Sequence, residues 1–302
     1  MLRYHRVSFG LTIVAHLALV GAGAQSSAPP VIDMHMHALG TAGTTAMLAL
    51  MDTLNVRAAI FIGPYASLTA ERGLAPSKLI PALTFPCENG RAPTSGVSCF
   101  GDGKEFPDVA ELRAAIGRGE VRALGEINAQ YLGIAPNDPR LEPYYALAEE
   151  LDIPVGIHLG IGAPGVAYPG PGFPPSKSSH YAGLAGDPRL LESVLVRHPK
   201  LRLYVMHAAW PYLEEMTYML YMHPQLYADV SVLQYAIPRA AYYRCLRELV
   251  DAGFASRIMF GSDGSARRLR DGVNAIMDAD FLTAEQKRAI LHDNAAKFLR
   301  LP

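Results

Sequence analysis

Two histidines at the end of an apolar segment are the residues of this 302-residue chain whose spacing points most directly to chemistry. Residues 31–37 read Val-Ile-Asp-Met-His-Met-His, and the apolar start of this segment predicts a short buried strand. Residues two apart on a strand project to the same face, so His35 and His37 would lie side by side. Paired imidazoles are typical ligands of a divalent metal ion.

Four further candidate ligands stand at or near the ends of other apolar segments: Glu126, His158, His207 and Asp263. A lone histidine in such a segment is more often a hydrogen-bonded core residue, and Glu126 at its position can also be a salt-bridge anchor. The recurrence of these residue types at strand ends, together with His-x-His, favours one shared metal site. Imidazole and carboxylate ligands suit one or two Zn²⁺ ions, with Mn²⁺, Fe²⁺ and Co²⁺ as alternatives.

The chain around these residues alternates apolar, strand-like segments with amphipathic ones. Segments rich in Val, Ile and Leu predict strands at 31–38, 57–63, 79–86, 121–128, 154–160, 201–208, 226–232 and 257–264. Helices are predicted at 44–54, 107–118, 141–151, 187–197, 212–222, 239–252 and 283–299. This alternation predicts an α/β fold, a (β/α)8 TIM barrel, in which the ends of the strands bring all six candidate ligands to one mouth. A doubly wound open sheet is the alternative, but no Gly-rich phosphate loop follows the first strand.

Two long connections and three side chains are candidates for a substrate pocket. The segments 87–104 and 161–186 follow strand ends and predict the walls or lid of a pocket, with a solvated surface loop as the alternative. Tyr131 and Trp210 can contribute aromatic surface to this pocket, or pack structurally, and His180 lies in the second segment.

Charged residues close to the predicted ligands have further candidate roles. Arg267 and Arg268 follow Asp263 and can bind a substrate carboxylate, although solvent-facing charge is the simpler interpretation. Asp229, on the seventh predicted strand, can support a metal ligand through a hydrogen bond.

The first 24 residues predict a signal peptide. Arg3 and Arg6 precede an apolar segment at 7–20, and an Ala-x-Ala cleavage motif ends at Ala24. An uncleaved membrane anchor is the alternative, but the apolar segment is short for a membrane span. Cleavage leaves residues 25–302 as a single barrel domain, periplasmic or secreted, without stable membrane insertion. Without Arg3 and Arg6 the chain has 25 basic and 28 acidic residues, a balance that argues against a nucleic-acid partner.

Export also affects how the three cysteines are interpreted. Cys87 and Cys99 flank a Gly-, Pro- and Ser-rich segment, and in an oxidising compartment they predict a disulfide that closes a short loop. Two unpaired thiols are the alternative. Cys245 lies in a predicted helix and is expected to be a buried free thiol.

The motifs that carry these residues resemble the amidohydrolase superfamily over about residues 31–301. They include Ile-Asp-Met-His-Met-His, Gly-Glu-Ile, Pro-Val-Gly-Ile-His-Leu-Gly, Tyr-Val-Met-His-Ala-Ala-Trp, Tyr-Ala-Asp-Val-Ser and Met-Phe-Gly-Ser-Asp. The set is similar to the amidohydrolase-related branch that contains the aminocarboxymuconate-semialdehyde decarboxylase type. A glutamate on the fourth strand is closer to the two-metal TatD-like hydrolases. Members of the branch often form dimers, so the resemblance implies a homodimer as one expectation.

The resemblance implies a role for each candidate ligand. The His-x-His pair and Asp263 would hold a first metal ion, and Asp263 would also accept a proton from the attacking water. His158 and His207 would complete a second metal site, bridged to the first by Glu126. In one-metal members, His158 joins the first metal, and His207 hydrogen-bonds the water or the substrate. Asp263 and His207 are therefore the catalytic candidates.

These residues support, as the first hypothesis, a metal-dependent hydrolase that acts on a small amide, lactone or ester substrate. A metal ion lowers the pKa of the water that it binds to about 7, so hydroxide forms near neutral pH. A neighbouring carboxylate can take the proton of that water and transfer it to the leaving group. The alternative is a metal-dependent non-oxidative decarboxylase of a small aromatic or unsaturated carboxylic acid, against which the predicted export counts. A binding protein without chemistry would not need six ligands, and the acidic charge disfavours a TatD-like nuclease.

Overall fold

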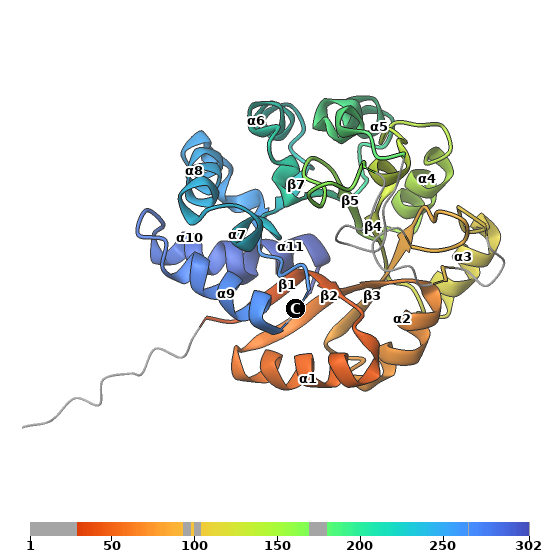
Figure 1. The fold of residues 1–302 in the computed structure, drawn as a ribbon, viewed down its shortest axis with the longest axis horizontal. Coiled ribbons are helices and arrows are strands. Elements are labelled where there is room, and N and C mark those ends of the chain that lie inside the picture. Colours follow the sequence, from red (N-terminus) through yellow and green to blue (C-terminus); the bar gives the residue numbers. More distant parts are fainter. Residues whose placement is uncertain (1–28, 93–97, 100–103, 169–179, 265, 302) are drawn as a thin grey trace, which may run out of the picture.

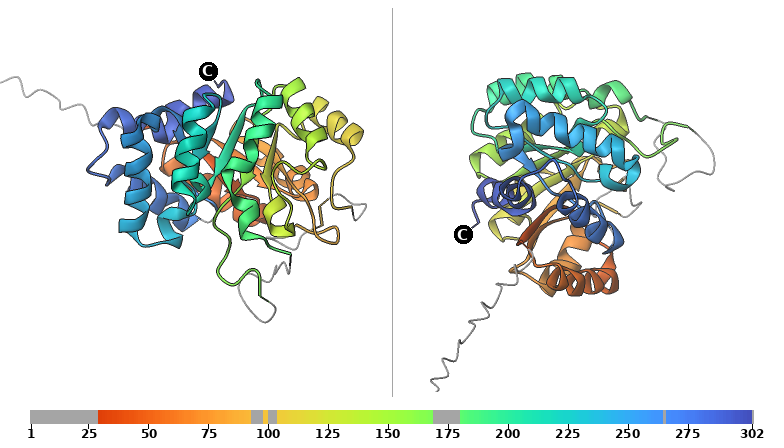
Figure 2. Two further views of the ribbon diagram at one scale, coloured as in Figure 1. Left: turned by 90° about the horizontal axis from the view of Figure 1, so that it is seen from above. Right: turned by 90° about the vertical axis from the view of Figure 1, so that its left-hand side faces the viewer.

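Eight parallel strands form a single sheet that follows the order of the chain. The computed structural model describes residues 29–92, 98–99, 104–168, 180–264 and 266–301, so the predicted signal peptide lies outside the described residues. The elements succeed one another around a ring in chain order, with the helices outside the strands (Figure 1, Figure 2). This arrangement confirms the predicted (β/α)8 barrel. A doubly wound sheet is excluded, because its strand order departs from the chain order.

All eight predicted strands are present, and most are shorter than predicted. They are β1 (Val31–His37), β2 (Val56–Gly63), β3 (Leu79–Phe85), β4 (Ala123–Ile127), β5 (Val155–His158), β6 (Leu203–Met206), β7 (Tyr227–Asp229) and β8 (Ile258–Met259). The last two strands are the shortest, with three and two residues.

The α-helices of the described residues cover the outside of the barrel. They are α1 (Gly40–Thr53), α2 (Tyr65–Glu71), α3 (Val109–Gly117), α4 (Glu142–Glu150), α5 (Glu192–Arg197), α6 (Leu213–Met222), α7 (Leu233–Ala236), α8 (Arg239–Leu249), α9 (Ala266–Met277), α10 (Ala284–Arg288) and α11 (Asn294–Leu299). None of these helices has both the length and the apolar character needed to cross a bilayer.

Three helices, α2, α7 and α9, are absent from the prediction. Helices α2 and α7 have seven and four residues, too few for a helical pattern to repeat. Helix α9 buries Leu269, Val273 and Ile276 at helical spacing, but its first turns are rich in arginine and read as a polar connection. The predicted helix at 283–299 is present as α10 and α11 with a π-helical segment, Ala289–Asp293, between them.

The buried apolar side chains form two layers because residues alternate across each strand. The outer layer packs strand residues such as Phe61 and Ile157 against the helices. The inner layer fills the barrel, and it includes Ile32, Met34, Ile60, Tyr204, Met206 and Met259. Gly156 faces this layer from β5, where a Cβ atom would lie 2.5 Å from Tyr204 and from Met206, so only glycine fits there.

The barrel closes where β1 meets the segment that follows β8. The backbone N–H of Asp263 donates to the carbonyl of His35 at 2.7 Å. The Asp33 carboxylate joins the same seam, because its Oδ1 accepts from the backbone N–H groups of His35 (3.0 Å) and Ser262 (2.9 Å). Burial raises the pKa of Asp33 to about 6, even though these hydrogen bonds act to lower it. The seam therefore consists of the candidate ligands and their direct neighbours.

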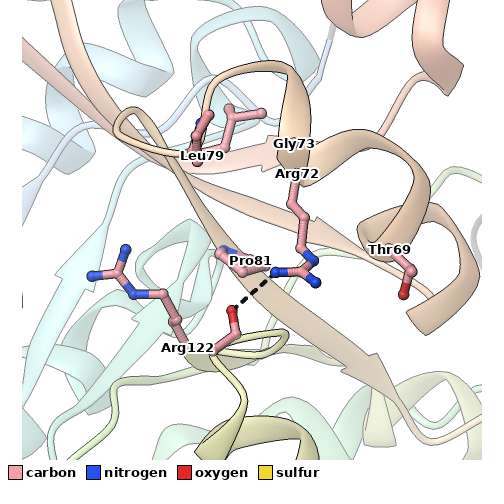
Figure 3. Close-up of a pocket in the computed structure, with 8 residues that line it drawn as sticks. Thr69, Arg72, Gly73, Leu79, Pro81 and Arg122 are labelled. Carbon is pink, nitrogen blue, oxygen red and sulfur yellow. Dashed lines mark hydrogen bonds between the residues drawn. The ribbon is translucent and has the colours of Figure 1, made fainter.

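A small cavity lies at the end of the barrel away from the candidate ligands, near the amino ends of β3 and β4 (Figure 3). Its volume is about 280 Å³, and Arg72, Leu79, Pro81 and Arg122 line it. Arg72 Nη1 donates to the Gly119 carbonyl at 3.4 Å. The amino ends of barrel strands form the face that serves stability, and two arginines make this cavity unsuited to a metal ion.

A disulfide joins Cys87 and Cys99, as predicted, with 6.4 Å between the Cα atoms and 12 residues of sequence separation. It closes the connection that follows β3. Cys245 is a buried free thiol, and burial raises its pKa to about 12. The thiol is therefore neutral and unreactive at ordinary pH.

The disulfide is expected to contribute about 3 kcal/mol to the free energy of unfolding, because it restricts the unfolded chain over a short loop. Cys87→Ala combined with Cys99→Ala should lower the denaturant midpoint accordingly, measured by circular dichroism in urea. A reductant should lower the midpoint of the unmodified protein and leave that of the double variant unchanged. Equal midpoints for the oxidised protein and the double variant would contradict this expectation.

Candidate metal centre

An irregularity in β1 directs two imidazoles into the mouth of the barrel. Ile32 and Met34 pack in the inner layer, whereas Met36 packs in the outer one. The pairing of β1 with β2 shifts register within this segment, which exchanges the faces of the residues that follow. Beyond the shift, His35 and His37 face the mouth together, at the carboxyl end of the strand.

The other four candidates come from the carboxyl ends of β4, β5, β6 and β8. Glu126 and His158 stand within their strands, and the pairing of β4 shifts register at Glu126, whereas His207 (φ 59°) and Asp263 (φ 49°) follow their strands in the left-handed backbone region. This conformation is unfavourable for residues other than glycine, and such positions cluster at functional sites. The fold therefore holds two candidate ligands in conformations that the surrounding structure must enforce.

One group of three ligand atoms includes both imidazoles of β1. The Nε2 atom of His37 lies 3.0 Å from Asp263 Oδ1 and 3.2 Å from His35 Nε2. His35 Nε2 lies 3.5 Å from Asp263 Oδ1. The candidate ligand atoms of these three residues all lie within 4.8 Å of one another, close enough to share one ion.

A second group of three contains His35, Glu126 and His207. The Glu126 carboxylate lies 3.8 Å from His35 Nε2 through Oε2 and 3.7 Å from His207 Nε2 through Oε1. Its Oε2 atom is also 3.7 Å from His37 Nε2, so the carboxylate stands between the two groups. Two groups that share His35 can hold one ion or a pair.

His158 lies beside the second group and outside both sets of three. Its Nδ1 atom is 2.5 Å from Glu126 Oε1 and 3.1 Å from His207 Nε2. Its Nε2 atom is buried and has no hydrogen-bond partner among the described residues. Burial lowers the pKa of His158, although the Glu126 carboxylate opposes that shift. A neutral imidazole with an unused nitrogen is available as a further ligand.

The charges of the site favour a bound cation. Burial acts to raise the pKa of Glu126 and of Asp263, but the facing imidazoles outweigh it and hold both pKa values below the usual range. Burial likewise opposes a charge on His35, yet Asp263, Asp229 and Glu126 raise its pKa well above the usual range. Such a site attracts positive charge, and its imidazole and carboxylate donors fit a divalent ion such as Zn²⁺.

Two side chains that contact the ligands were missed in the sequence. Ser231 Oγ lies 3.0 Å from His35 Nδ1 and 2.9 Å from His207 Nδ1. The Tyr235 hydroxyl donates to Asp263 Oδ2 at 2.8 Å. The signal for Ser231 was its place two residues after Asp229, which strand alternation puts on the same face. For Tyr235, in the short helix α7, we find no comparable signal.

Five of the six candidate ligands, all except His35, line a cavity of about 530 Å³. Its walls are mostly apolar, and they include Ile161 and Pro164 from the connection after β5, which was predicted to form a wall. Tyr131 lines the cavity and is buried, with its ring 4.9 Å from that of His158. The described residues of the connection 87–104 do not line it.

Of the remaining pocket candidates, only Arg268 is among the described residues that line the cavity. Trp210 is half-buried against the outer layer, and His180 is exposed; neither is among the described residues that line the cavity. Arg267 is exposed to solvent. Arg268 lines the cavity, where its guanidinium lies 4.2 Å from the centre of the Tyr235 ring.

Solved structures similar to this chain show barrels of the same kind. An uncharacterised TIM-barrel protein from Bordetella bronchiseptica has a TM-score of 0.62 at 16% identity, over 90% of this chain and 98% of its own. A 5-carboxyvanillate decarboxylase from Sphingomonas paucimobilis has a TM-score of 0.58 at 12% identity, over 90% and 99%. A protein described as a probable 2-pyrone-4,6-dicarboxylic acid hydrolase from Acinetobacter baumannii has 0.58 at 15%, over 90% and 99%. At these identities the likeness establishes the fold.

Sequence comparison identifies the family of the chain. The curated Protein fluG of Emericella nidulans is 26% identical over 81 residues, which are 27% of this chain and only 9% of that protein. The family model described as amidohydrolase matches residues 32–301, from the first strand to the last helix. Because this match includes every strand of the barrel and all six candidate ligands, the chain belongs to the amidohydrolase family.

Proposed function

We propose that this protein is a metal-dependent hydrolase of a small amide, lactone or ester. The observation that carries the proposal is the pair of three-ligand groups that share His35 beside a cavity. The first group, with His37 and Asp263, and the second, with Glu126 and His207, would hold the metal. A divalent ion held there supplies a Lewis acid that polarises a carbonyl and makes water acidic near neutral pH.

Asp263 is the side chain best placed to move a proton in this reaction. Its Oδ1 atom faces His37, and its Oδ2 atom accepts a hydrogen bond from Tyr235. Its lowered pKa keeps the carboxylate ionised, so it can take a proton from the attacking water and return it to the leaving group. Tyr235 fixes the carboxylate, because burial and the Asp263 charge raise the pKa of its hydroxyl and keep it a donor.

The cavity suits a small substrate with an apolar body. Its volume is about 530 Å³, within the range of small-molecule sites, and Ile161, Pro164 and Val232 are among its apolar walls. These walls exclude water from the reacting carbonyl and strengthen the electrostatic interactions of the ligand residues.

One observation favours a non-oxidative decarboxylase as the second candidate. Arg268 is the only lysine or arginine among the described residues that line the cavity. It donates to the Asp263 carbonyl at 2.9 Å, and it forms no ion pair with a carboxylate of the described residues. A guanidinium in this position can bind the acid group of a substrate. The similar structures include a 5-carboxyvanillate decarboxylase and a probable 2-pyrone-4,6-dicarboxylic acid hydrolase, and both names give an acid as the substrate.

Metal content tests the proposed metal centre and the role of Glu126 in it. The mature protein is expected to contain two metal ions per chain by elemental analysis, and Glu126→Ala should reduce this to one or none, because the carboxylate stands between both groups. Glu71→Ala is the matched control, since Glu71 is an equally buried carboxylate that accepts from Thr44 at 2.6 Å, outside the site. One ion that survives Glu126→Ala would instead make Glu126 a hydrogen-bonding neighbour of a single-metal site.

Loss of the proton-transfer group should slow the reaction more than it weakens binding. Asp263→Asn is expected to lower kcat by about 10²–10⁴-fold, the range for a general acid–base group, with a smaller change in KM. The measurement is hydrolysis across a panel of amides, lactones and esters, with carbon dioxide release from benzoate-type acids assayed in parallel. Carbon dioxide release without any hydrolysis would favour the decarboxylase.

Arg268 provides a test of substrate charge. Arg268→Met, which keeps the length of the side chain, should raise KM for substrates with a carboxylate by about 10- to 100-fold, the value of one charged hydrogen bond. KM for neutral substrates should stay the same, and Arg267→Met should change neither value, because Arg267 is exposed. An equal effect of Arg268→Met on acidic and neutral substrates would show that the guanidinium supports Asp263 and not the substrate.

A further inference from the structure

One buried hydroxyl group contacts two of the candidate ligands on the side away from the cavity. Ser231 Oγ lies 3.0 Å from Nδ1 of His35 and 2.9 Å from Nδ1 of His207. It also donates to Oδ1 of Asp229 at 2.5 Å. All four side chains are buried, with Asp229 and Ser231 fully inaccessible to solvent.

Counting protons fixes the direction of each of these hydrogen bonds. An ionised carboxylate can only accept, so the single proton of the Ser231 hydroxyl is directed to Asp229. The two lone pairs of the hydroxyl then remain for the two imidazoles, and each of them must donate an N–H from Nδ1. His35 and His207 therefore each have a proton on Nδ1.

We propose that Asp229, acting through Ser231, sets the proton positions of His35 and His207 so that both present Nε2 to the metal. The two are positioning residues, since neither lines the cavity. The nitrogen that binds a metal is determined by the hydrogen bond of the other nitrogen, and one carboxylate here determines it for two rings. The inference rests on the metal centre of the proposed function and is independent of the reaction catalysed there.

The surroundings of Asp229 hold the carboxylate in one orientation. Its Oδ1 atom also accepts from the backbone N–H groups of His207 at 3.0 Å and Ser231 at 2.9 Å. Its Oδ2 atom has no hydrogen-bond partner within the described residues and lies 3.4 Å from His35 Nδ1. Every atom that faces Nδ1 of His35 is thus an acceptor.

The two carboxylate oxygens of Asp229 have different surroundings, which makes Asp229→Asn an informative variant. Two backbone N–H groups require an acceptor at the Oδ1 position, so the amide oxygen would occupy it and the amide nitrogen would replace Oδ2. That nitrogen would direct an N–H at Nδ1 of His35, where the ring now has a proton. The ring is then driven to the tautomer with its proton on Nε2, which blocks the metal-binding nitrogen.

The first measurement is zinc affinity by competition with a chromophoric chelator. Asp229→Asn is expected to weaken zinc binding by about 10- to 100-fold, the usual effect of losing such a partner, while thermal unfolding of the metal-free protein stays close to that of the unmodified protein. Ser262→Ala is a control for loss of a buried polar group beside His35: the Ser262 hydroxyl is as buried as Asp229 and donates to the carbonyl of His35 at 3.2 Å, away from its ring, so zinc affinity should not change. Unchanged affinity in Asp229→Asn would overturn the proposal.

The second measurement needs no variant that must fold. In ¹⁵N-histidine-labelled, unmodified protein, the ring nitrogens of His35 and His207 are expected to show a proton on Nδ1 both before and after zinc is added. A spectrum that places an unprotonated Nδ1 in either ring overturns the proposal. If the protein has protonated Nδ1 atoms but binds no zinc, the positioning inference holds and the proposed metal centre fails.

Discussion

Buried negative charge is the constraint around which the mouth of this barrel is built. Glu126, Asp229 and Asp263 lie within one small region, and an isolated buried carboxylate is strongly unfavourable unless positive charge or several donors compensate it. No lysine or arginine of the described residues forms an ion pair with these three carboxylates. Compensation instead comes from imidazoles, backbone N–H groups and, in the proposed function, a divalent ion. In the proposed function, a bound cation adds to this compensation.

Closure of the barrel and assembly of the ligands depend on the same few residues. The seam between β1 and the end of β8 is formed by backbone hydrogen bonds of His35 and Asp263, both candidate ligands, and by Asp33 between them. Asp229 has a similar double role, because it anchors the backbone at His207 while it contacts the neighbouring rings. A displacement of a ligand would thus disturb the strand ends, which explains how left-handed backbone at two ligands is maintained.

The sequence predicts the strands well, and it also selects the six candidate ligands that the structure brings together, because both rest on local patterns: apolar runs, and residues of metal-binding type at their ends. The orientation of individual side chains depends on contacts between distant segments. Ser231 is an ordinary hydroxyl in the sequence, and only the approach of β1 and β6 to β7 makes it the partner of two imidazoles. Arg268 and Arg267 are adjacent and chemically identical, yet the start of α9 directs one into the cavity and leaves the other in solvent.

Strand ends and connections carry different groups: the strand ends carry the candidate ligands, and the connections carry much of the cavity wall. The six candidate ligands, Asp263 among them, stand on or directly beside strands, so their geometry is as rigid as the barrel. This geometry fits the metal-assisted proton transfer proposed for hydrolysis and for decarboxylation alike. The groups that face a substrate come from elsewhere: Ile161 and Pro164 follow β5, Tyr235 belongs to α7, and Arg268 belongs to α9. Connections tolerate change that a strand end does not. These three segments supply part of the cavity wall outside the strand ends, and Arg268 is the side chain through which the proposed decarboxylase would bind an acidic substrate.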